Sequence, residues 1–382
     1  MQPATDNALA VKHAMPLPEH AGMPALDDTA AETSWFEFAP AHFFYVPIAL
    51  YCAWLSLRHL GPTLLTNANP ALPYSGLVGE SKFSVLNQLN GTARDYTAPY
   101  ARFLRWPGDG GTDRTFREAT SGMTATGLRY PVVAKPDIGM RGAGVQVIKN
   151  DTDLRHYISV FPSGANFLLQ TLIDMEGEAG IFYVRHPEEP KGQIISLTLK
   201  YFPSVIGNGT NTLYELIRAD KRAGKLSHLY LERHKSKLDT IVPDGEKVRL
   251  AFAGNHCRGT IFRNGNDFIT DTMIDTFDKL AKSMGEFYIG RFDVRFNSFS
   301  ELQNGTGFKI IEVNGAGGEV THIWDSRMTL WGAYKALMGQ FRHLYVIGNK
   351  NRKRGFLPTP LFSLFKAWRH EKKLTKHYPI TH

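Results

Sequence analysis

The chain has 382 residues, 43% of them apolar and 12% aromatic, which is enough to bury a large core and to form two or three structural units. The net charge of +8 lies in the tail from residue 350 onward, so residues 1–349 are near neutral and a nucleic-acid-binding body is not expected. The two cysteines, Cys52 and Cys257, cannot form a disulfide framework and lack zinc-site spacing, which predicts a reducing, cytoplasmic environment.

The N-terminal region raises the question of a membrane span. Residues 1–34 are rich in Ala, Pro and Asp, which predicts a mobile leader without a secretory signal. Residues 38–57 contain no Asp, Glu, Lys or Arg and are nearly as long as the ~20 apolar residues that cross a bilayer. Because Pro40 and Pro47 interrupt this stretch, a buried helix from about residue 47 is favoured, and a membrane segment is the alternative.

The rest of the chain predicts a mixture of helices and strands without an internal repeat. Residues 35–89 form a first α/β segment with a helix at 48–57, a short strand at 63–66 and a helix capped by Ser81. A turn-rich loop is expected at 106–114. Further strands are expected at 132–135, 145–148, 167–172, 181–185, 194–201, 291–296 and 308–313, and further helices at 152–160, 212–223 and 271–284. The many short connections favour an α+β class with mixed sheets over a regular βαβ repeat.

Two of these strands carry alternating polar side chains. Arg291 and Asp293 share one face of the first strand, and Glu312 and Asn314 share one face of the second. If the strands pair as a hairpin across 297–307, two carboxylates, an amide and a guanidinium converge on one surface. Hard oxygen ligands of this kind suit Mg²⁺ that also holds phosphates, and an arginine beside them would offset phosphate charge. A solvated sheet face with ordinary ion pairs is the alternative interpretation.

A second candidate feature is a lysine followed by a glycine-rich loop. Lys135 ends an apolar strand, and the loop to the next strand contains Gly139, Gly142 and Gly144. Glycines allow backbone N–H groups to close around phosphate oxygens, and the lysine adds a point charge. The loop is neither a Walker A motif nor a Gly-x-Gly-x-x-Gly fingerprint, so a flexible β-hairpin is the alternative.

In this order and spacing, the two features resemble the ATP-grasp superfamily, which includes D-alanine–D-alanine ligase, glutathione synthetase and cyanophycin synthetase. The resemblance covers roughly residues 81–319, and its most specific part is Gly-Arg-Phe-Asp-Val followed by Ile-Ile-Glu-Val-Asn. It implies an α+β fold of two lobes that grip ATP, preceded by a small α/β N-terminal domain. The implied organisation is a leader at 1–34, an N-terminal segment at 35–89, an ATP-grasp domain at 90–345 with a small lobe at about 130–200 and a large lobe at about 201–345, and a basic tail at 346–382.

The resemblance also implies roles for individual residues. Asp293, Glu312 and Asn314 match ligands of Mg²⁺, with Mn²⁺ as an alternative, and Arg291 and Lys200 match groups that lie near the phosphates and neutralise them. The implied nucleotide-binding residues are Lys82, Lys135, Gly139, Gly142, Gly144, Gln170, Ile173 and Glu178, of which Glu178 falls at the ribose carboxylate.

The activity implied by the resemblance is ATP-dependent ligation. A substrate carboxylate, from a small molecule or a peptide, would become an acyl-phosphate and then join an amine or a thiol. The loop 315–322 differs from that of D-alanine–D-alanine ligase, so D-alanine is not supported as substrate. A phosphotransferase acting on a hydroxyl and a non-catalytic nucleotide-binding module are the alternatives. Arg258, Arg263 and His256 could bind the carboxylate or could belong to an exposed loop.

The basic tail interleaves aromatic residues with lysines and arginines. Such a pattern can lie on an anionic membrane surface, but a solvated tail or a packed terminal helix is favoured. Nucleic acid is not an expected partner, and a homodimer is an open alternative to a monomer.

Overall fold

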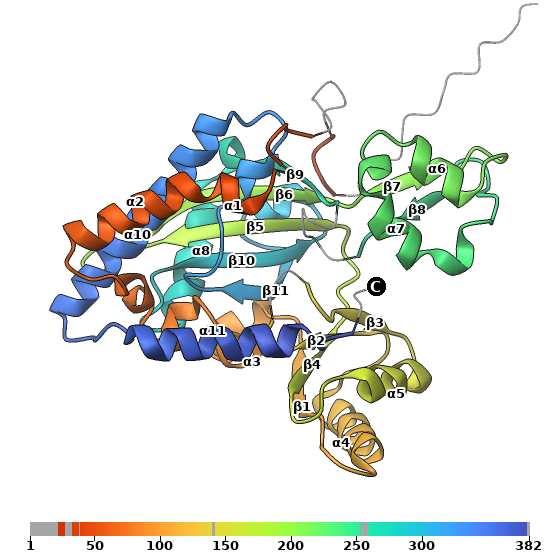
Figure 1. Cartoon of the computed structure of the whole chain (residues 1–382), viewed down its shortest axis with the longest axis horizontal. Helices are drawn as coiled ribbons and strands as arrows, with labels where there is room; N and C mark the ends of the chain where they lie inside the picture. The colour runs from red at the N-terminus through yellow and green to blue at the C-terminus, as the bar shows by residue number, and fades with distance from the viewer. Residues whose placement is uncertain are drawn as a thin grey trace, which may run out of the picture.

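The computed structural model describes residues 22–26, 33–37, 39–139, 142–252, 254 and 259–379. Two antiparallel sheets and a small two-stranded sheet are surrounded by helices, which confirms the predicted α+β class (Figure 1). The larger sheet has the order β11-β10-β5-β6-β9, made of β11 (Phe308–Asn314), β10 (Ile289–Phe296), β5 (Gly177–Val184), β6 (Gln193–Tyr201) and β9 (Ile261–Asn264).

The larger sheet is covered on both faces. On one face, α8 (Asp271–Ser283) packs Met273, Phe277 and Leu280 against apolar side chains of β5, β6 and β10. On the other face, Leu337 and other residues of α10 (Leu330–Lys353) pack against β5, β9 and the start of β10. Further along the strands this second face changes from apolar to charged, at Lys200, Arg291 and Asp293, and the candidate site lies there. Two short helices, α3 (Lys82–Leu86) and α9 (Phe299–Gln303), lie near β11 and β10 respectively.

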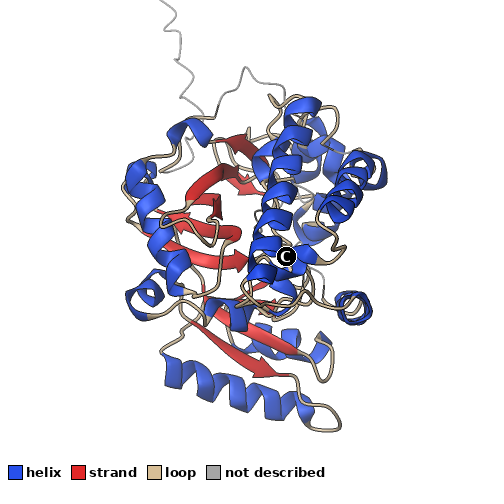
Figure 2. Cartoon of the chain, turned by 90° about the vertical axis from the view of Figure 1, so that its left-hand side faces the viewer, coloured by secondary structure: helices blue, strands red, loops and turns tan. Residues whose placement is uncertain are grey.

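The smaller sheet has the order β1-β4-β2-β3 and lies below the larger one in Figure 2. Its strands are β1 (Tyr100–Leu104), β4 (Asn166–Thr171), β2 (Val132–Pro136) and β3 (Gln146–Ile148). Helices α4 (Gly111–Thr126) and α5 (Asp151–Val160) share an apolar core with this sheet. Neither β1 nor α4 was predicted, and the loop expected at 106–114 is wrong from residue 111 onward, where α4 begins.

A small module lies between β6 and β9 in the chain. It contains β7 (Ser204–Ile206), α6 (Leu213–Ala219), α7 (Ser227–Arg233) and β8 (Lys247–Arg249), and it has an apolar core of its own. Thr212 and Glu215 form a capping box at the start of α6, as the helix predicted from residue 212 requires.

The N-terminal helices lie on the surface. Helix α2 (Val46–Arg58) contains the predicted helix at 48–57, and the short helix α1 (Ala41–Phe44) precedes it. Because α2 buries only Ile48 and Leu55, the prediction that this helix is buried is wrong. Within the described part of the chain, no helix is long and apolar enough to cross a membrane. Residues Leu64–Asn67 form a 3₁₀ helix where a strand was predicted, because the Asn67 side chain donates hydrogen bonds to the carbonyl oxygens of Gly348 and Phe356.

The structure departs from the predicted boundaries in three places. Strands β5 and β6, expected in the small lobe at 130–200, pair within the larger sheet. Helix α10 runs through residue 346, and α11 (Leu361–Thr375) follows it. Within the predicted leader, the carbonyl oxygen of Pro24 accepts a hydrogen bond from Tyr201, while residues 1–21 and 27–32 lie outside the described residues.

Candidate active site

One cavity of about 970 Å³ lies against the charged end of the larger sheet and the strands and glycine loop of the smaller sheet. Twelve of the thirteen residues singled out in the sequence line it, and Gly144 is the exception. The lining members of that set are Lys82, Lys135, Gly139, Gly142, Gln170, Ile173, Glu178, Lys200, Arg291, Asp293, Glu312 and Asn314. Residues separated by more than two hundred positions in sequence therefore meet at one concave surface.

The predicted hairpin of β10 and β11 is confirmed by the strand register. Asp293 lies opposite Glu312, and Arg291 lies opposite Asn314. The pairing shifts by one residue directly after Asp293, which is a local irregularity at the centre of the site. The connection between the strands contains α9 and is not a plain loop.

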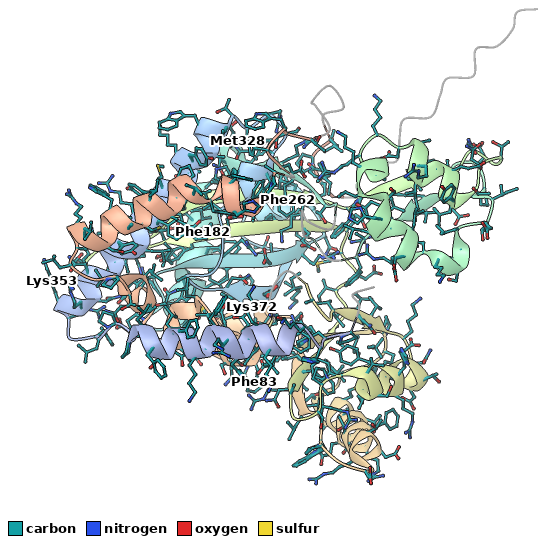
Figure 3. The ribbon with its side chains drawn as sticks, in the orientation of Figure 1. Phe83, Phe182, Phe262, Met328, Lys353 and Lys372 are labelled. Carbon is teal, nitrogen blue, oxygen red and sulfur yellow. The ribbon has the colours of Figure 1, made fainter. Side chains whose placement is uncertain are left out.

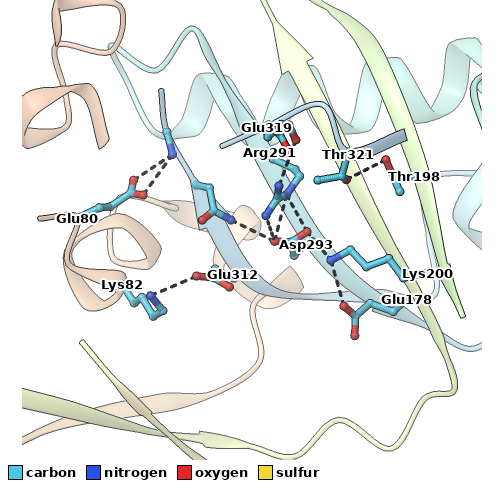
Figure 4. A network of polar contacts seen from close by, with 12 residues as sticks. Glu80, Lys82, Glu178, Thr198, Lys200, Arg291, Asp293, Glu312, Glu319 and Thr321 are labelled. Atoms are coloured by element: carbon cyan, nitrogen blue, oxygen red, sulfur yellow. Dashed lines mark hydrogen bonds and ion pairs between the residues drawn. The ribbon is translucent and has the colours of Figure 1, made fainter. Parts of the chain in front are cut away.

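Asp293 is the centre of a buried polar network (Figure 4). Its Oδ1 accepts from Lys200 Nζ at 2.8 Å, and its Oδ2 accepts from Arg291 Nη2 at 3.0 Å and from Asn314 Nδ2 at 3.1 Å. Burial acts to raise the pKa of Asp293, but the charges of Arg291 and Lys200 outweigh it and hold that pKa at about 2. Gly180 lies opposite Asp293 on β5, where a Cβ would lie 3.2 Å from both Arg291 and Asp293.

Lys200 joins this network to a second carboxylate. Its Nζ lies 3.1 Å from Glu178 Oε1, and Glu178 Oε2 lies 2.8 Å from Arg295 Nε. Burial lowers the pKa of Lys200, but Asp293 and Glu178 together raise it above its ordinary value, so the ammonium stays charged. Glu178, implied to bind ribose, therefore lines the cavity as the partner of two cations.

Two more lysines approach from the other side of the cavity. Lys135 Nζ donates to Gln170 Oε1 at 2.7 Å and to the Ile311 carbonyl oxygen at 2.8 Å. Lys82 Nζ donates to the Gly139 carbonyl oxygen at 2.8 Å and lies 3.3 Å from Glu312 Oε1. Burial lowers the pKa of Lys135 to about 8, so this lysine loses its charge within a pH range close to neutrality.

Several residues of the site were missed in the sequence. Glu80 lies beside Lys82 in the chain, and its Oε1 accepts from the Gly315 backbone N–H at 3.0 Å. Burial raises its pKa to about 8. Glu319 accepts hydrogen bonds from Tyr45 and Trp324, and its carbonyl oxygen accepts from Arg291. Nothing local marks Glu80 or Glu319, because their partners lie far away in sequence.

Of the three residues that could bind the substrate carboxylate, one lies in the described part of the chain. Arg263 lies on β9 and is buried, so it does not belong to an exposed loop. Arg258 and His256 lie outside the described residues.

The donor set fits a magnesium ion held together with phosphates. Asp293, Glu312 and Asn314 offer two carboxylates and one amide on paired strands. The described residues contain no group of three or more His, Cys, Asp or Glu side chains that could hold a metal ion by themselves. Mg²⁺ usually takes one or two carboxylates and completes its shell with water and substrate phosphates, so a smaller donor set is the expected one.

Part of the sequence resembles that of ligases of the ATP-grasp type. In particular, the chain is similar to cyanophycin synthetase of Synechocystis sp., at 27% identity over 222 residues, which cover 52% of this chain and 24% of that enzyme. This sequence similarity confirms the predicted resemblance, although the chain spans only about a quarter of the length of that relative.

Solved structures of similar proteins include D-alanine–D-alanine ligase from Bacillus anthracis, at 12% identity, with 75% of this chain and 72% of that chain covered and a TM-score of 0.43. They also include a bifunctional glutathione synthetase from Pasteurella multocida, at 16% identity, with 68% and 36% covered and a TM-score of 0.34. No protein-family model matches the sequence.

Proposed function

We propose that the chain is a magnesium- and ATP-dependent ligase that activates a carboxylate and joins it to an amine or a thiol. The observation that carries this proposal is the composition of the cavity wall. Lys82, Lys135, Lys200 and Arg291 line it together with the oxygen donors of β10 and β11. A cavity lined by this many cations is suited to a polyphosphate, and the neighbouring carboxylates are suited to its metal ion.

Each charged residue has a place in the proposed reaction. Lys82, which contacts the glycine loop at Gly139, and Lys135, which contacts β11 at Ile311, neutralise the phosphates on the side of the smaller sheet. Lys200 and Arg291 hold positive charge where the γ-phosphate would lie, and Asp293 keeps both of them in position. A magnesium ion held by Asp293, Glu312 and Asn314 would supply further charge neutralisation. Phosphoryl transfer depends mainly on such positioning and electrostatics, so no protein nucleophile is required.

The proposed chemistry has two steps. In the first step, a carboxylate oxygen of the substrate attacks the γ-phosphorus, the bond to the β-phosphate oxygen breaks, and ADP leaves. In the second step, an amine nitrogen or thiol sulfur attacks the carbonyl carbon of the acyl-phosphate, phosphate leaves, and the nucleophile loses its proton. We place the substrates in the part of the cavity lined by Phe44, Tyr45, Trp324 and Phe262, with Lys225 at its wall. The expected compartment is the cytoplasm.

The test is a phosphate-release screen of the purified chain with Mg-ATP against amino acids, peptides and polyamines. We expect ADP, free phosphate and an amide or thioester product, identified by mass spectrometry. ADP together with a phosphorylated acceptor would instead show a phosphotransferase. Nucleotide binding without turnover on any substrate pair would favour a non-catalytic module and contradict the proposal.

A further inference from the structure

Most of the large apolar side chains that are exposed in the described residues lie in two stretches, 43–60 and 357–368. The first is a stripe on α1 and α2, where Phe43 is 70% exposed, Leu50 68% and Leu57 75%. Their spacing of about one or two helical turns places them on one side of a continuous helical segment. Soluble monomers rarely expose contiguous apolar surface of this extent without a partner.

The second stretch is the outer side of α11. Phe362, Phe365 and Trp368 are exposed, and Phe362 is 80% exposed. The inner side of α11 is engaged, because Glu371 Oε2 accepts from the Gly79 backbone N–H at 2.8 Å and Leu374 packs against the core of the smaller sheet. The tail is therefore a packed terminal helix that still presents an aromatic surface to solvent.

The two stretches lie on the same side of the molecule. Helices α2 and α11 both face the viewer in Figure 1, and both lie at the right-hand edge of Figure 2. The segment that follows α2 meets the segment that precedes α11, since the Thr359 backbone N–H donates to Thr66 Oγ1 at 2.9 Å. Leu60 and Leu357, both exposed, lie in the two segments that meet there. We call this surface, made of the outward residues of 43–60 and 357–373, the docking face.

The charge of the docking face has one sign. Residues 39–61 contain no acidic residue, and the tail carries an excess of lysine and arginine. The acid of α11, Glu371, is buried, so it does not offset the exposed lysines. Lys372 lies on α11, and Lys353 marks the end of α10 beside the start of the tail (Figure 3). Arg369 lies over the Phe365 ring and Lys372 over the Trp368 ring, so cations and aromatic groups alternate on the surface.

We propose that the docking face binds peripherally to an anionic lipid surface. Exposed Phe, Trp and Leu side chains next to Lys and Arg are the composition of helices that lie in the headgroup region of membranes. Anionic headgroups attract such lysines and arginines, whereas a second copy of the chain would oppose positive charge to positive charge. The face therefore fits anionic lipid better than it fits its own copy, and neither helix needs to span the bilayer.

The test is co-sedimentation of the full chain with phosphatidylcholine vesicles, with and without phosphatidylglycerol, at low and high salt. We expect binding to the anionic vesicles that weakens with salt, and much weaker binding to the neutral ones. Phe362→Ser combined with Phe365→Ser should lower partitioning at least about tenfold. Lys372→Gln combined with Lys373→Gln should lower it by roughly fivefold for each charge removed, and only on anionic vesicles.

One control variant and one further docking-face variant complete the test. Tyr214→Ser combined with Ile241→Ser removes two exposed apolar side chains from the small module and should leave vesicle binding unchanged. Leu50→Ser combined with Trp54→Ser removes two exposed apolar side chains of the α2 stripe and should lower binding without any change in the tail. The proposal is wrong if the wild-type chain binds neither vesicle, or if the docking-face variants bind as well as it does. A wild-type dimer in sedimentation velocity that the Phe362→Ser, Phe365→Ser variant abolishes would identify the face as a contact between copies and overturn the proposal.

Discussion

Replacing Asp293 by Asn tests the centre of the proposed site. The substitution keeps the size of the side chain but removes the charge that faces Arg291 and Lys200. Two buried cations then lie close together without their shared anion, and the oxygen donor for the metal ion becomes a weaker neutral amide. We therefore expect a loss of stability and a larger loss of turnover.

The size of the stability loss follows from the structure. The pKa of Asp293 is held at about 2, below its ordinary 3.8, so the folded chain favours the ionised carboxylate more than the unfolded chain does, by an energy on the order of 2 kcal/mol. Breaking one partner of a buried ion pair typically costs about 3–5 kcal/mol. Asparagine retains one acceptor oxygen, so we expect the free energy of unfolding to fall by about 3 kcal/mol. Removal of one preorganised electrostatic group from a transition state typically lowers kcat by about 10²–10³-fold.

Thermal unfolding, ADP binding and phosphate release measure the three expectations separately. ADP binding should persist, because Asn removes negative charge from a cavity that receives an anion. Asp278→Asn is the matched control, since Asp278 is also a buried carboxylate with an ion pair, to Lys282, but does not line the cavity. It should lower stability and leave phosphate release intact. Turnover by Asp293→Asn at the wild-type rate would refute the assignment of this network to catalysis.

Three further predictions concern the groups around the network. Because burial lowers the pKa of Lys135 to about 8, ADP affinity should fall as pH rises through 8, by up to about tenfold per pH unit. Lys135→Met should bind ADP weakly, and its affinity should not show this dependence on pH. Glu80 has a pKa of about 8 in the folded chain and an ordinary value of 4.5, so its ionisation lowers the stability of the fold progressively as pH rises from about 4.5 to 8. The melting temperature of Glu80→Gln relative to wild type should therefore increase over that pH range and then level off. A difference in melting temperature that stays constant with pH would contradict this. The Tyr378 hydroxyl donates a hydrogen bond to the Ile138 carbonyl oxygen, and its ring stacks on that of Phe161 with 5.4 Å between the ring centroids. Tyr378→Ala should therefore loosen the glycine loop, which would appear as faster limited proteolysis and a several-fold weaker ADP affinity. Tyr378→Phe should retain the stacking and most of the ADP affinity.

The parts of the site that were predictable are those whose signal is local. The alternation around Asp293 fixed which side chains share a strand face, and the cavity brings those faces together. Lys135 was recognisable because it ends an apolar strand and a glycine-rich loop begins a few residues after it. Glu80 and Glu319 were not recognisable, because their importance comes from a backbone N–H and from aromatic side chains that only the folded chain places beside them.

The elements that were missed have weak local patterns. Helix α4 is rich in threonine and glycine, which have low helix propensity, and only a few apolar residues such as Phe116 and Met123 mark its buried side. The run at 63–66 has the composition of a strand, but side-chain hydrogen bonds from Asn67 to a distant helix and its following loop favour a turn of 3₁₀ helix over residues 64–67. Tertiary contacts therefore decided the conformation at both places.

Helix α11 contacts the proposed nucleotide-binding cavity with one side and solvent with the other. Its Glu371 lines the cavity and holds the backbone at Gly79, while Phe362 and Phe365 belong to the docking face. Coupling between two binding events on such an element is reciprocal, because the free energies around a closed cycle must sum to zero. If lipid shifts α11 so that ADP affinity changes by some factor, ADP must change the affinity for lipid by the same factor. Vesicle binding measured with and without ADP therefore reports whether α11 couples nucleotide binding in the cavity to lipid binding at the docking face.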